Sequence, residues 1–451
     1  MLFTPLIKFL EVSDHLPKRA QYLIQKFLVI ASAYSSLFFI SGTFYVLFVL
    51  DIVSYVELGK LAALSFIVQA VFDYPSGTLG DWIGQRWILA IAFISYGISY
   101  WLLAFADSFE SLATVYILSA FAASQESGAL QAWFDNNYKT ATENKDTERT
   151  VYQTFLGKFN MIQGFTWAFT ILIGGFIATY LFRETVFVLQ AIGMIILGII
   201  SLFVIKDLPG TKKSEQSVKK YFALLKEGVM FVLTTKHIFF FIAGFCLLNA
   251  MWMIWGNMIL FPMYYGYTGS DLGAGIFRFV SWINQSATAS VAGKISIKLN
   301  FRSWIPRLEW IVMFGYFTFF AVIFLIFPLQ DKLNLAPIAL VIIAFALLDF
   351  CVNIMAVLRQ RFYLDAIPDH IRNSIYSLIP TSILLVSAVF MIFAGSFIEQ
   401  YGFTITLIVM ACVGTIAALI MYYGFRCMPQ NKTSSNKDLG TYKINPAESQ
   451  D

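Results

Sequence analysis

The fold of this chain is decided by one short stretch, Asp73-Tyr-Pro-Ser-Gly-Thr-Leu-Gly-Asp-Trp-Ile-Gly-Gln-Arg86, which separates two long apolar runs. Gly77 has no side chain, so another helix can approach its backbone closely. Asp81 places a carboxylate at the membrane edge, where the positive N-terminal end of a neighbouring helix can bind it. Gly84 suits a tight turn, and Arg86 adds a positive charge on the same side. The stretch therefore predicts a tight connection between two membrane-spanning helices.

The composition around this stretch is that of a membrane protein. The chain is 58% hydrophobic and only 13% charged, which is too apolar for an ordinary soluble globule. Its formal net charge of +4 is modest and gives no reason to expect a nucleic-acid partner. Its four cysteines and three histidines lack metal-ligand spacing. We therefore expect a lipid-embedded protein without a metal site or cofactor.

Apolar runs recur along the chain at lengths that suit membrane-spanning helices. At 451 residues there is room for about a dozen spans of roughly 20 residues each. Lipid offers the backbone no hydrogen-bond partners, so the spans must be helical, and the alternating pattern of a membrane barrel is absent. The expected fold is all-α and polytopic, with twelve spans at about 24–49, 56–78, 87–106, 110–134, 152–180, 184–205, 237–264, 270–296, 306–329, 336–359, 375–398 and 403–425.

The positions of lysine and arginine predict the orientation. Basic residues gather in the stretch 206–236, near Arg86, in 294–307, in 359–372 and in the C-terminal tail, whereas the opposite connections contain few. Positive connections remain in the cytoplasm, so both termini are expected there, and an even number of spans agrees. A cleaved signal is not expected, because residues 1–22 lack an apolar core followed by a small-residue cleavage site. We place the protein in a plasma membrane, by preference a prokaryotic cytoplasmic membrane.

The polar stretch 206–236 divides the spans into two groups of six. Its second part, Tyr221–Leu233, alternates apolar and basic residues as interfacial helices do. The polar tail resembles disordered segments in composition. The expected parts are a six-helix bundle, a cytoplasmic linker with an amphipathic helix, a second six-helix bundle and a disordered tail, at 1–205, 206–236, 237–428 and 429–451.

The stretch from Gly77 to Arg86 resembles the signature loop between the second and third helices of the major facilitator superfamily, Gly-x-Leu-small-Asp-Arg-x-Gly-Arg-Arg. Six positions match: Gly77, Leu79, Gly80, Asp81, Gly84 and Arg86. Trp82 and Gln85 depart from the pattern, since the family has basic residues there. The resemblance implies two pseudo-symmetric six-helix bundles that rock about a central substrate site.

Other stretches extend the resemblance. Ser127-Gly128-Ala129 followed by Asp135 resembles the end of the family's fourth helix, which implies that Asp135 lies near Arg86. The stretch 367–374 resembles the connection into the eleventh helix, which implies that Asp81 faces Ser374 when the cytoplasmic side is closed. Gly174-Gly175 retains only the glycine pair of a pattern that antiporters have in the fifth helix, and such a pair allows close helix packing.

Four charged residues lie inside apolar spans: Glu126, Lys158, Arg278 and Asp349. Each costs at least a few kcal/mol on insertion scales and so requires a reason. Glu126 and Lys158 are expected at one depth, and Arg278 can reach Asp349. In the family the first, fourth, seventh and tenth helices line the cavity, which implies that Glu126 and Asp349 face it from opposite halves. They would bind a proton or a cationic group of the substrate. The alternative is two buried salt bridges, Glu126–Lys158 and Arg278–Asp349, that only fix helix positions.

Polar and aromatic residues accompany these charges. Asn249 and Trp252 are three residues apart and share a helix face, and Trp282 and Asn353 lie near Arg278 and Asp349. An apolar-aromatic cavity with few polar groups suits an amphipathic organic molecule. The alternative is that these side chains simply pack and hydrogen-bond between helices.

Together these observations predict a secondary transporter, not an enzyme. No phosphate-cradling loop, nucleophile elbow or zinc motif is present. We expect a monomer that moves a small organic solute by alternating access, coupled to protons because buried carboxylates can take up a proton. Efflux of drug-like or amphipathic compounds is favoured, and uptake of a metabolite or sugar is the alternative. A transporter-like receptor that binds without transport, or a membrane enzyme, would be the rival from another class.

Overall fold

A computed structural model describes most of the 451 residues, namely 16–143, 145–146, 150–206, 218–296, 298–368 and 371–428. Within these ranges it describes only the backbone at 74–82, 150, 218–222, 224, 286, 289–290, 293–294 and 372–373. The expected tail, 429–451, and the first part of the expected linker lie outside the described residues.

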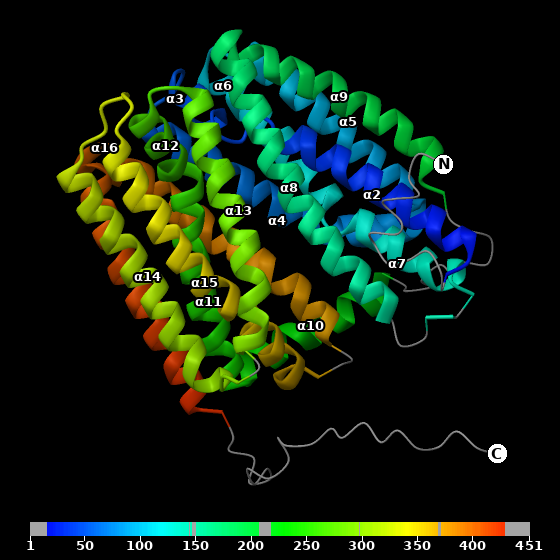
Figure 1. The fold of residues 1–451 in the computed structure, drawn as a ribbon. Helices are drawn as coiled ribbons and strands as arrows, with labels where there is room; N and C mark the ends of the chain where they lie inside the picture. The colour runs from blue at the N-terminus through cyan, green and yellow to red at the C-terminus, as the bar shows by residue number, and fades with distance from the viewer. Residues whose placement is uncertain are drawn as a thin grey trace, which may run out of the picture.

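The first half of the chain folds into helices that pack side by side (Figure 1). In chain order they are α2 (Lys18–Phe39), α3 (Tyr45–Leu50), α4 (Tyr55–Ile83), α5 (Gln85–Ala104), α6 (Phe109–Glu126), α7 (Ala129–Ala141), α8 (Thr150–Tyr180) and α9 (Arg183–Val204). The expected first span is therefore two helices, α2 and α3, joined by a turn at 40–44.

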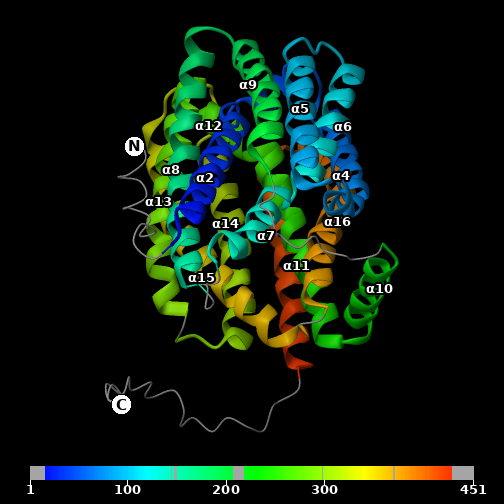
Figure 2. The same cartoon turned by 90° about the vertical axis from the view of Figure 1, so that its right-hand side faces the viewer.

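The second half follows α10 (Val218–Thr234), which lies beside the start of α16 (Figure 2). A Cβ added at Gly228 of α10 would lie 3.3 Å from the Ser374 side chain. The remaining helices are α11 (Lys236–Ile254), the π-helix η1 (Trp255–Ile259), α12 (Leu260–Thr268), α13 (Asp271–Ser296), α14 (Phe301–Ile326), α15 (Leu335–Ala366) and α16 (Arg372–Arg426).

The helices account for twelve membrane crossings. Nine spans in the described part of the chain are long and apolar enough to cross a membrane. One of them, Ser374–Arg426, comprises two consecutive helices, because Gly402 (φ 74°) interrupts α16. The more polar α6 and α13 also run through the bundles, next to α5 and α8 respectively. The outer faces expose large apolar side chains such as Phe203 and Leu325, as expected of helices that face lipid.

The two halves form a V (Figure 1). We call the end at which α7 and α10 lie the basic end, since the basic connections predict it to be cytoplasmic, and the end at which α3 and α12 lie the opposite end. The halves meet at the opposite end and diverge toward the basic end. The contacts between them are made mainly by α4 with α16 and by α8 with α13.

Glycines allow these two contacts to be close. A Cβ on Gly59 of α4 would lie 2.5 Å from the Met391 carbonyl oxygen of α16, and one on Gly395 would lie 2.2 Å from the Tyr55 carbonyl oxygen. A Cβ on Gly175 of α8 would lie 2.6 Å from the Asp271 carbonyl oxygen of α13. The neighbouring Gly174 meets the Ile40 backbone in the same way. The predicted close packing at the fifth-helix glycine pair is thus confirmed.

The stretch Asp73–Arg86 is more helical than expected. α4 continues through it to Ile83, and α5 begins at Gln85, so the connection is reduced to Gly84. Gly84 has φ 95°, a conformation that glycine adopts without the steric cost of a Cβ. The predicted tight turn at Gly84 is confirmed, whereas the second span, expected to end at about residue 78, continues to Ile83.

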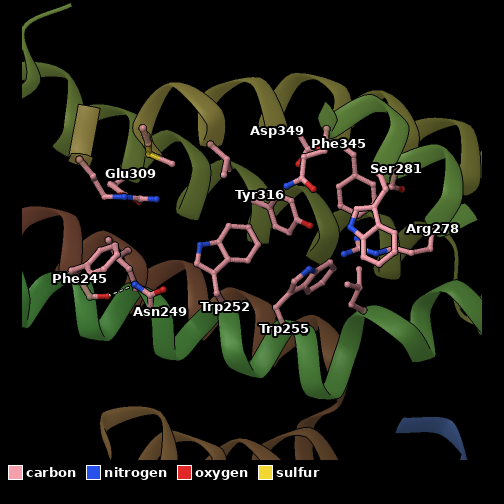
Figure 3. Close-up of a pocket in the computed structure, with 18 residues that line it drawn as sticks. Phe245, Asn249, Trp252, Trp255, Arg278, Ser281, Glu309, Tyr316, Phe345 and Asp349 are labelled. Carbon is pink, nitrogen blue, oxygen red and sulfur yellow. Dashed lines mark hydrogen bonds and ion pairs between the residues drawn. The ribbon is translucent and has the colours of Figure 1, made fainter. Parts of the chain in front are cut away.

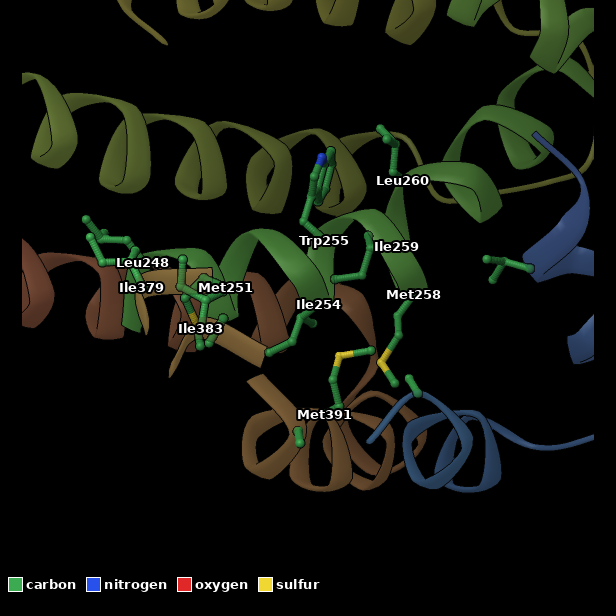
Figure 4. Close-up of a cluster of buried hydrophobic side chains, with 14 of the residues drawn as sticks. Leu248, Met251, Ile254, Trp255, Met258, Ile259, Leu260, Ile379, Ile383 and Met391 are labelled. Atoms are coloured by element: carbon green, nitrogen blue, oxygen red, sulfur yellow. The ribbon is translucent and has the colours of Figure 1, made fainter. Parts of the chain in front are cut away.

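Apolar side chains hold the second half together. Leu248, Met251 and Ile254 of α11 pack against Ile379 and Ile383 of α16 (Figure 4). Further along, Met258 of η1 and Met391 of α16 lie together beside α4. All of these side chains are buried. This core therefore fixes α11 against α16 and places the π-helix at the junction with the first half.

Candidate functional site

A central cavity of about 340 Å³ lies between the two halves. The first half supplies aromatic rings and hydroxyl or amide groups, and the second half supplies an arginine, an amide and two further aromatic rings. Its principal lining residues are Phe38, Phe39, Ser41, Tyr45, Ser65, Gln69, Tyr96, Ser99, Tyr100, Tyr116, Ser119, Asn257, Phe261, Arg278 and Trp282. Cavities of this size accept small organic molecules.

A second cavity, of about 370 Å³, lies within the second half between α11, α13, α14 and α15 (Figure 3). Asn249 and Trp252 of α11 point into it from one helix face, as their spacing predicts, and Trp255 of η1 points into it as well. Tyr316 packs against both indole rings, with ring centroids 4.9 Å from Trp252 and 5.1 Å from Trp255. Asn249 donates a hydrogen bond to the Phe245 carbonyl oxygen at 2.8 Å, within its own helix.

Arg278 and Trp282 of α13 line both cavities. The Arg278 guanidinium carbon lies 4.6 Å from the centre of the Trp282 ring, a cation–π geometry that orients the guanidinium group. Trp282 in turn contacts Phe39 of the first half, with ring centroids 5.4 Å apart. These two side chains therefore connect the interior of the second half with the interface between the halves.

Asp349 of α15 lines the second cavity on the side of Arg278 (Figure 3). Asn284 donates a hydrogen bond to its carboxylate at 3.4 Å, and Arg278 attracts it electrostatically. Among the described contacts, however, Arg278 and Asp349 do not form a direct ion pair. The structure thus brings the two expected partners to one cavity without locking them together.

One ion pair in the second cavity was not expected from the sequence. Arg359 of α15 binds Glu309 of α14, with Nη1 and Oε1 2.6 Å apart, and the Glu309 side chain is only 2% exposed. The Arg359 guanidinium also lies over the Phe245 ring at 5.1 Å. Charged residues are common near the ends of membrane spans, so the positions of these two residues did not suggest a buried ion pair between residues fifty apart in the chain. The one indication in the sequence was that both lie inside the expected apolar spans, 306–329 and 336–359.

Glu126 is the last residue of α6, and the left-handed Gly128 (φ 72°) separates α6 from α7. The expectation that Glu126 lies about two turns inside a longer fourth helix is therefore wrong. Glu126 lies near enough to Tyr34 and Tyr96 to interact with both electrostatically, and the two tyrosine rings lie 6.1 Å apart. Tyr96 lines the central cavity, so Glu126 acts electrostatically on the wall of that cavity without lining either cavity itself.

The other expected site residues lie in different surroundings. Lys158 is half-buried in α8, two turns from its start. Asn353 of α15 donates hydrogen bonds to the Thr288 hydroxyl at 2.9 Å and the Gln285 carbonyl oxygen at 3.1 Å, which fasten α15 to α13. The contacts described for Asn353 are therefore helix-to-helix contacts outside the lining of either cavity.

The expected gating residues lie at the basic end. Only the backbone of Gly77 and Asp81 is described, so the surroundings of the Asp81 carboxylate are not. Arg86 is exposed, and its guanidinium lies over the Trp87 ring at 5.3 Å. Asp135 of α7 accepts hydrogen bonds from Gln131 at 3.0 Å and from the Tyr152 hydroxyl. In this conformation Arg86 and Asp135 therefore interact with their own neighbours in the first half.

The opposite end contains ion pairs that the sequence analysis did not single out. Arg183 at the start of α9 holds Asp271 at the start of α13 through two hydrogen bonds, of 2.9 Å from Nε and 3.0 Å from Nη2. Its remaining terminal nitrogen binds Asp51 at 2.8 Å. Nearby, the Leu272 amide donates to the Thr179 hydroxyl at 2.9 Å. Arg183 thus joins the first half to the second at the opposite end, where the two halves meet.

Comparisons with known proteins agree with this architecture. A sequence model of the Major Facilitator Superfamily matches residues 27–345. The nucleoside transporter NupG is similar in structure, with a TM-score of 0.71, 13% identity, and coverage of 91% of this chain and 100% of that one. A bacterial homologue of the human lysosomal transporter Spinster, in an inward-facing and unoccupied conformation, and the POT family transporter PepTSo each give a TM-score of 0.66 at 12% identity, covering 91% of this chain and 98% of theirs. No curated protein sequence matches the chain.

Proposed function

Because the chain belongs to the Major Facilitator Superfamily and is therefore a secondary transporter of small solutes, we propose that it moves an amphipathic organic solute by proton-coupled alternating access. The observation that carries this proposal is the central cavity, which both halves line with aromatic rings and hydrogen-bonding groups. A solute held there contacts both halves, so their relative movement can expose it to either side of the membrane.

The conformation fits one stage of such a cycle. The halves are joined at the opposite end by α4 with α16, by α8 with α13 and by Arg183, and they diverge at the basic end. We assign the basic end and both termini to the cytoplasm because of the positive connections. In the other conformation, Gly77, Asp81, Gly84 and Arg86 engage the start of α16 and Asp135. Asp81→Asn weakens that conformation and lowers flux in proteoliposomes; unchanged flux would exclude the gate.

Proton coupling is assigned to Asp349 and Glu126. Asp349 lines the second cavity together with Arg278, which also lines the central cavity, and Glu126 interacts electrostatically with Tyr34 and with Tyr96 of the central cavity wall. A proton on either carboxyl group changes the charge balance near the bound solute. Lys158 is placed by this proposal near the cytoplasmic entrance, where its charge attracts the Glu126 carboxylate.

The test of coupling is solute accumulation driven by an imposed pH gradient. Proteoliposomes with Glu126→Gln or Asp349→Asn lose gradient-driven accumulation and retain exchange of solute in both directions. The matched controls are Glu110→Gln and Asp365→Asn, exposed acids on the same two helices, which keep accumulation. Persistent accumulation in both site variants excludes these carboxyl groups as the proton carriers.

Efflux of a drug-like compound is the favoured direction and class, because rings make up much of the cavity wall. A second candidate, uptake of a metabolite, is supported by the many hydroxyl groups and by Arg278 in the same wall. A thermal-shift screen on the purified chain identifies binding compounds. Flux of each hit under inward and outward proton gradients then separates the two directions, and absence of counterflow for every hit would favour a receptor over a transporter.

A further inference from the structure

The described lining of the central cavity carries a net positive charge. Among its described lining residues Arg278 is the only ionised side chain, and the others are aromatic, aliphatic, hydroxyl or amide groups. An arginine remains protonated in proteins, so the cavity is positive whenever Arg278 faces it. A solute with a positive charge would meet repulsion there with no described carboxylate in the lining to offset it.

The hydrogen bonds of Arg278 are incomplete. Its Nε atom is buried and has no partner among the described residues. Its Nη1 reaches only the Tyr264 hydroxyl, at 3.4 Å. A buried donor without an acceptor is unfavourable, and a guanidinium group is suited to a carboxylate that accepts from Nε and a terminal nitrogen together. The group is therefore suited to an acceptor that the described residues do not supply.

The aromatic residues around Arg278 define the rest of the solute. Trp282, against which the guanidinium lies, packs between Phe39 and Trp167, with a ring-centroid distance of 5.9 Å to Trp167. The Trp167 Nε1 donor is also buried without a described partner. Flat rings against this wall would be stabilised by stacking and burial. The wall thus combines a surface for a planar ring with unpartnered donors beside it.

From these contacts we infer that the solute is an organic anion with a planar ring, whose acidic group binds Arg278 and whose ring lies against Trp282. The inference rests on the proposed function and names its substrate class. Asp349 is the competitor for the same guanidinium group, since it attracts Arg278 from the second cavity without a direct ion pair. When Asp349 is protonated and neutral, it no longer attracts Arg278, and the guanidinium group can bind the solute. Proton binding to Asp349 and solute binding to Arg278 are therefore coupled.

The test uses the purified full-length chain and three probes of one shape: naphthoate, neutral naphthamide and cationic naphthylmethylammonium. Binding is measured by calorimetry. Naphthoate is expected to bind about 10- to 100-fold more tightly than naphthamide, as the loss of charge-assisted hydrogen bonds predicts. Equal binding of the three probes, or a preference for the cation, overturns the inference whatever the variants do.

Variants then locate the preference. Arg278→Gln removes the difference between naphthoate and naphthamide, Arg278→Lys keeps a reduced one, and Asp349→Asn strengthens naphthoate binding. The matched control is Arg307→Gln, because Arg307 is an exposed arginine that also lies over a tryptophan ring, at 5.9 Å from Trp304. An unchanged preference in a folded Arg278→Gln protein refutes the assignment to Arg278.

The outcome also distinguishes this inference from the proposed function. If the neutral or cationic probe binds and is transported in preference to naphthoate, the transport proposal stands and the anion inference fails. If solutes of every charge bind without flux, the transport proposal fails.

Discussion

Replacing Arg183 with glutamine is expected to weaken the contact between the two halves at the opposite end. Arg183 joins the halves through a two-pronged contact with Asp271, whose side chain is 9% exposed, and contacts Asp51, whose side chain is 66% exposed. An exposed ion pair contributes little, whereas removing one partner of a buried charged pair costs about 2–5 kcal/mol. Arg183 is itself 16% exposed, so we take the lower part of that range, about 2 kcal/mol. The ratio of closed to open forms at this end then falls about 30-fold.

The assay is a distance measurement across the opposite end. Spin labels at Asp107→Cys and Lys332→Cys, both exposed positions, report the separation of the halves by pulsed electron paramagnetic resonance in a background without native cysteines. Arg183→Gln shifts the distance distribution toward longer separations. Asp51→Asn is the control and changes the populations by less than about threefold, since its side chain is mostly in solvent.

A double-mutant cycle shows whether the effect belongs to the contact itself. Asp271→Asn alone also weakens the contact at the opposite end, and combining it with Arg183→Gln adds little, because the second substitution removes a partner that has already lost its counter-charge. The reasoning is refuted if Arg183→Gln leaves the distance distribution unchanged, or if Asp51→Asn has an equal effect.

Three further predictions follow from contacts described above. Gly175→Val inserts side-chain atoms where a Cβ already lies 2.6 Å from the Asp271 carbonyl oxygen, so it separates α8 from α13 and raises reactivity of opposite-end cysteine probes; full closure in that variant would contradict the packing. Arg359→Ala leaves the Glu309 carboxylate buried and unpaired, and lowers stability by about 3–5 kcal/mol in denaturation experiments, whereas the double variant with Glu309→Gln recovers a large part of the loss. Gly84→Ala forces a Cβ into a φ of 95° and costs about 1 kcal/mol or more, measured as a lower Tm, although nothing crowds the site.

The membrane fold could be predicted because lipid imposes simple requirements on a sequence. Each span needs a long apolar run, and basic connections mark one side, so hydropathy and the positions of lysine and arginine located the helices. The exceptions have local causes. α4 extends to Ile83, although the stretch is polar and contains Pro75, and the helix ends at Gly84, whose φ of 95° is not helical.

The residues of the candidate site were harder to predict from the sequence than the helices, because their contacts depend on which helices lie next to each other. Arg278 and Asp349 could be recognised as unusual charges in apolar spans, and the structure places both at one cavity. Glu309 and Arg359 lie nearer span ends, where charges are common, so their burial becomes visible only when α14 packs on α15. Asn353 is polar for a packing reason, since its amide joins α15 to α13. The tyrosines of the central cavity had no distinguishing sequence signal in a chain rich in aromatic residues.

The wide turn at η1 lies where its helix begins to line the central cavity. Asn249 and Trp252 of α11 face the second cavity, whereas Asn257 within η1 and Phe261 of α12 line the central one. An ordinary helix turns about 100° per residue, so deleting one residue from Trp255–Ile259 would rotate the following segment by that angle relative to the preceding one. Phe261 would then point away from the solute, while the length of the span would hardly change. The extra residue in η1 therefore sets the direction in which α12 presents its side chains to the solute.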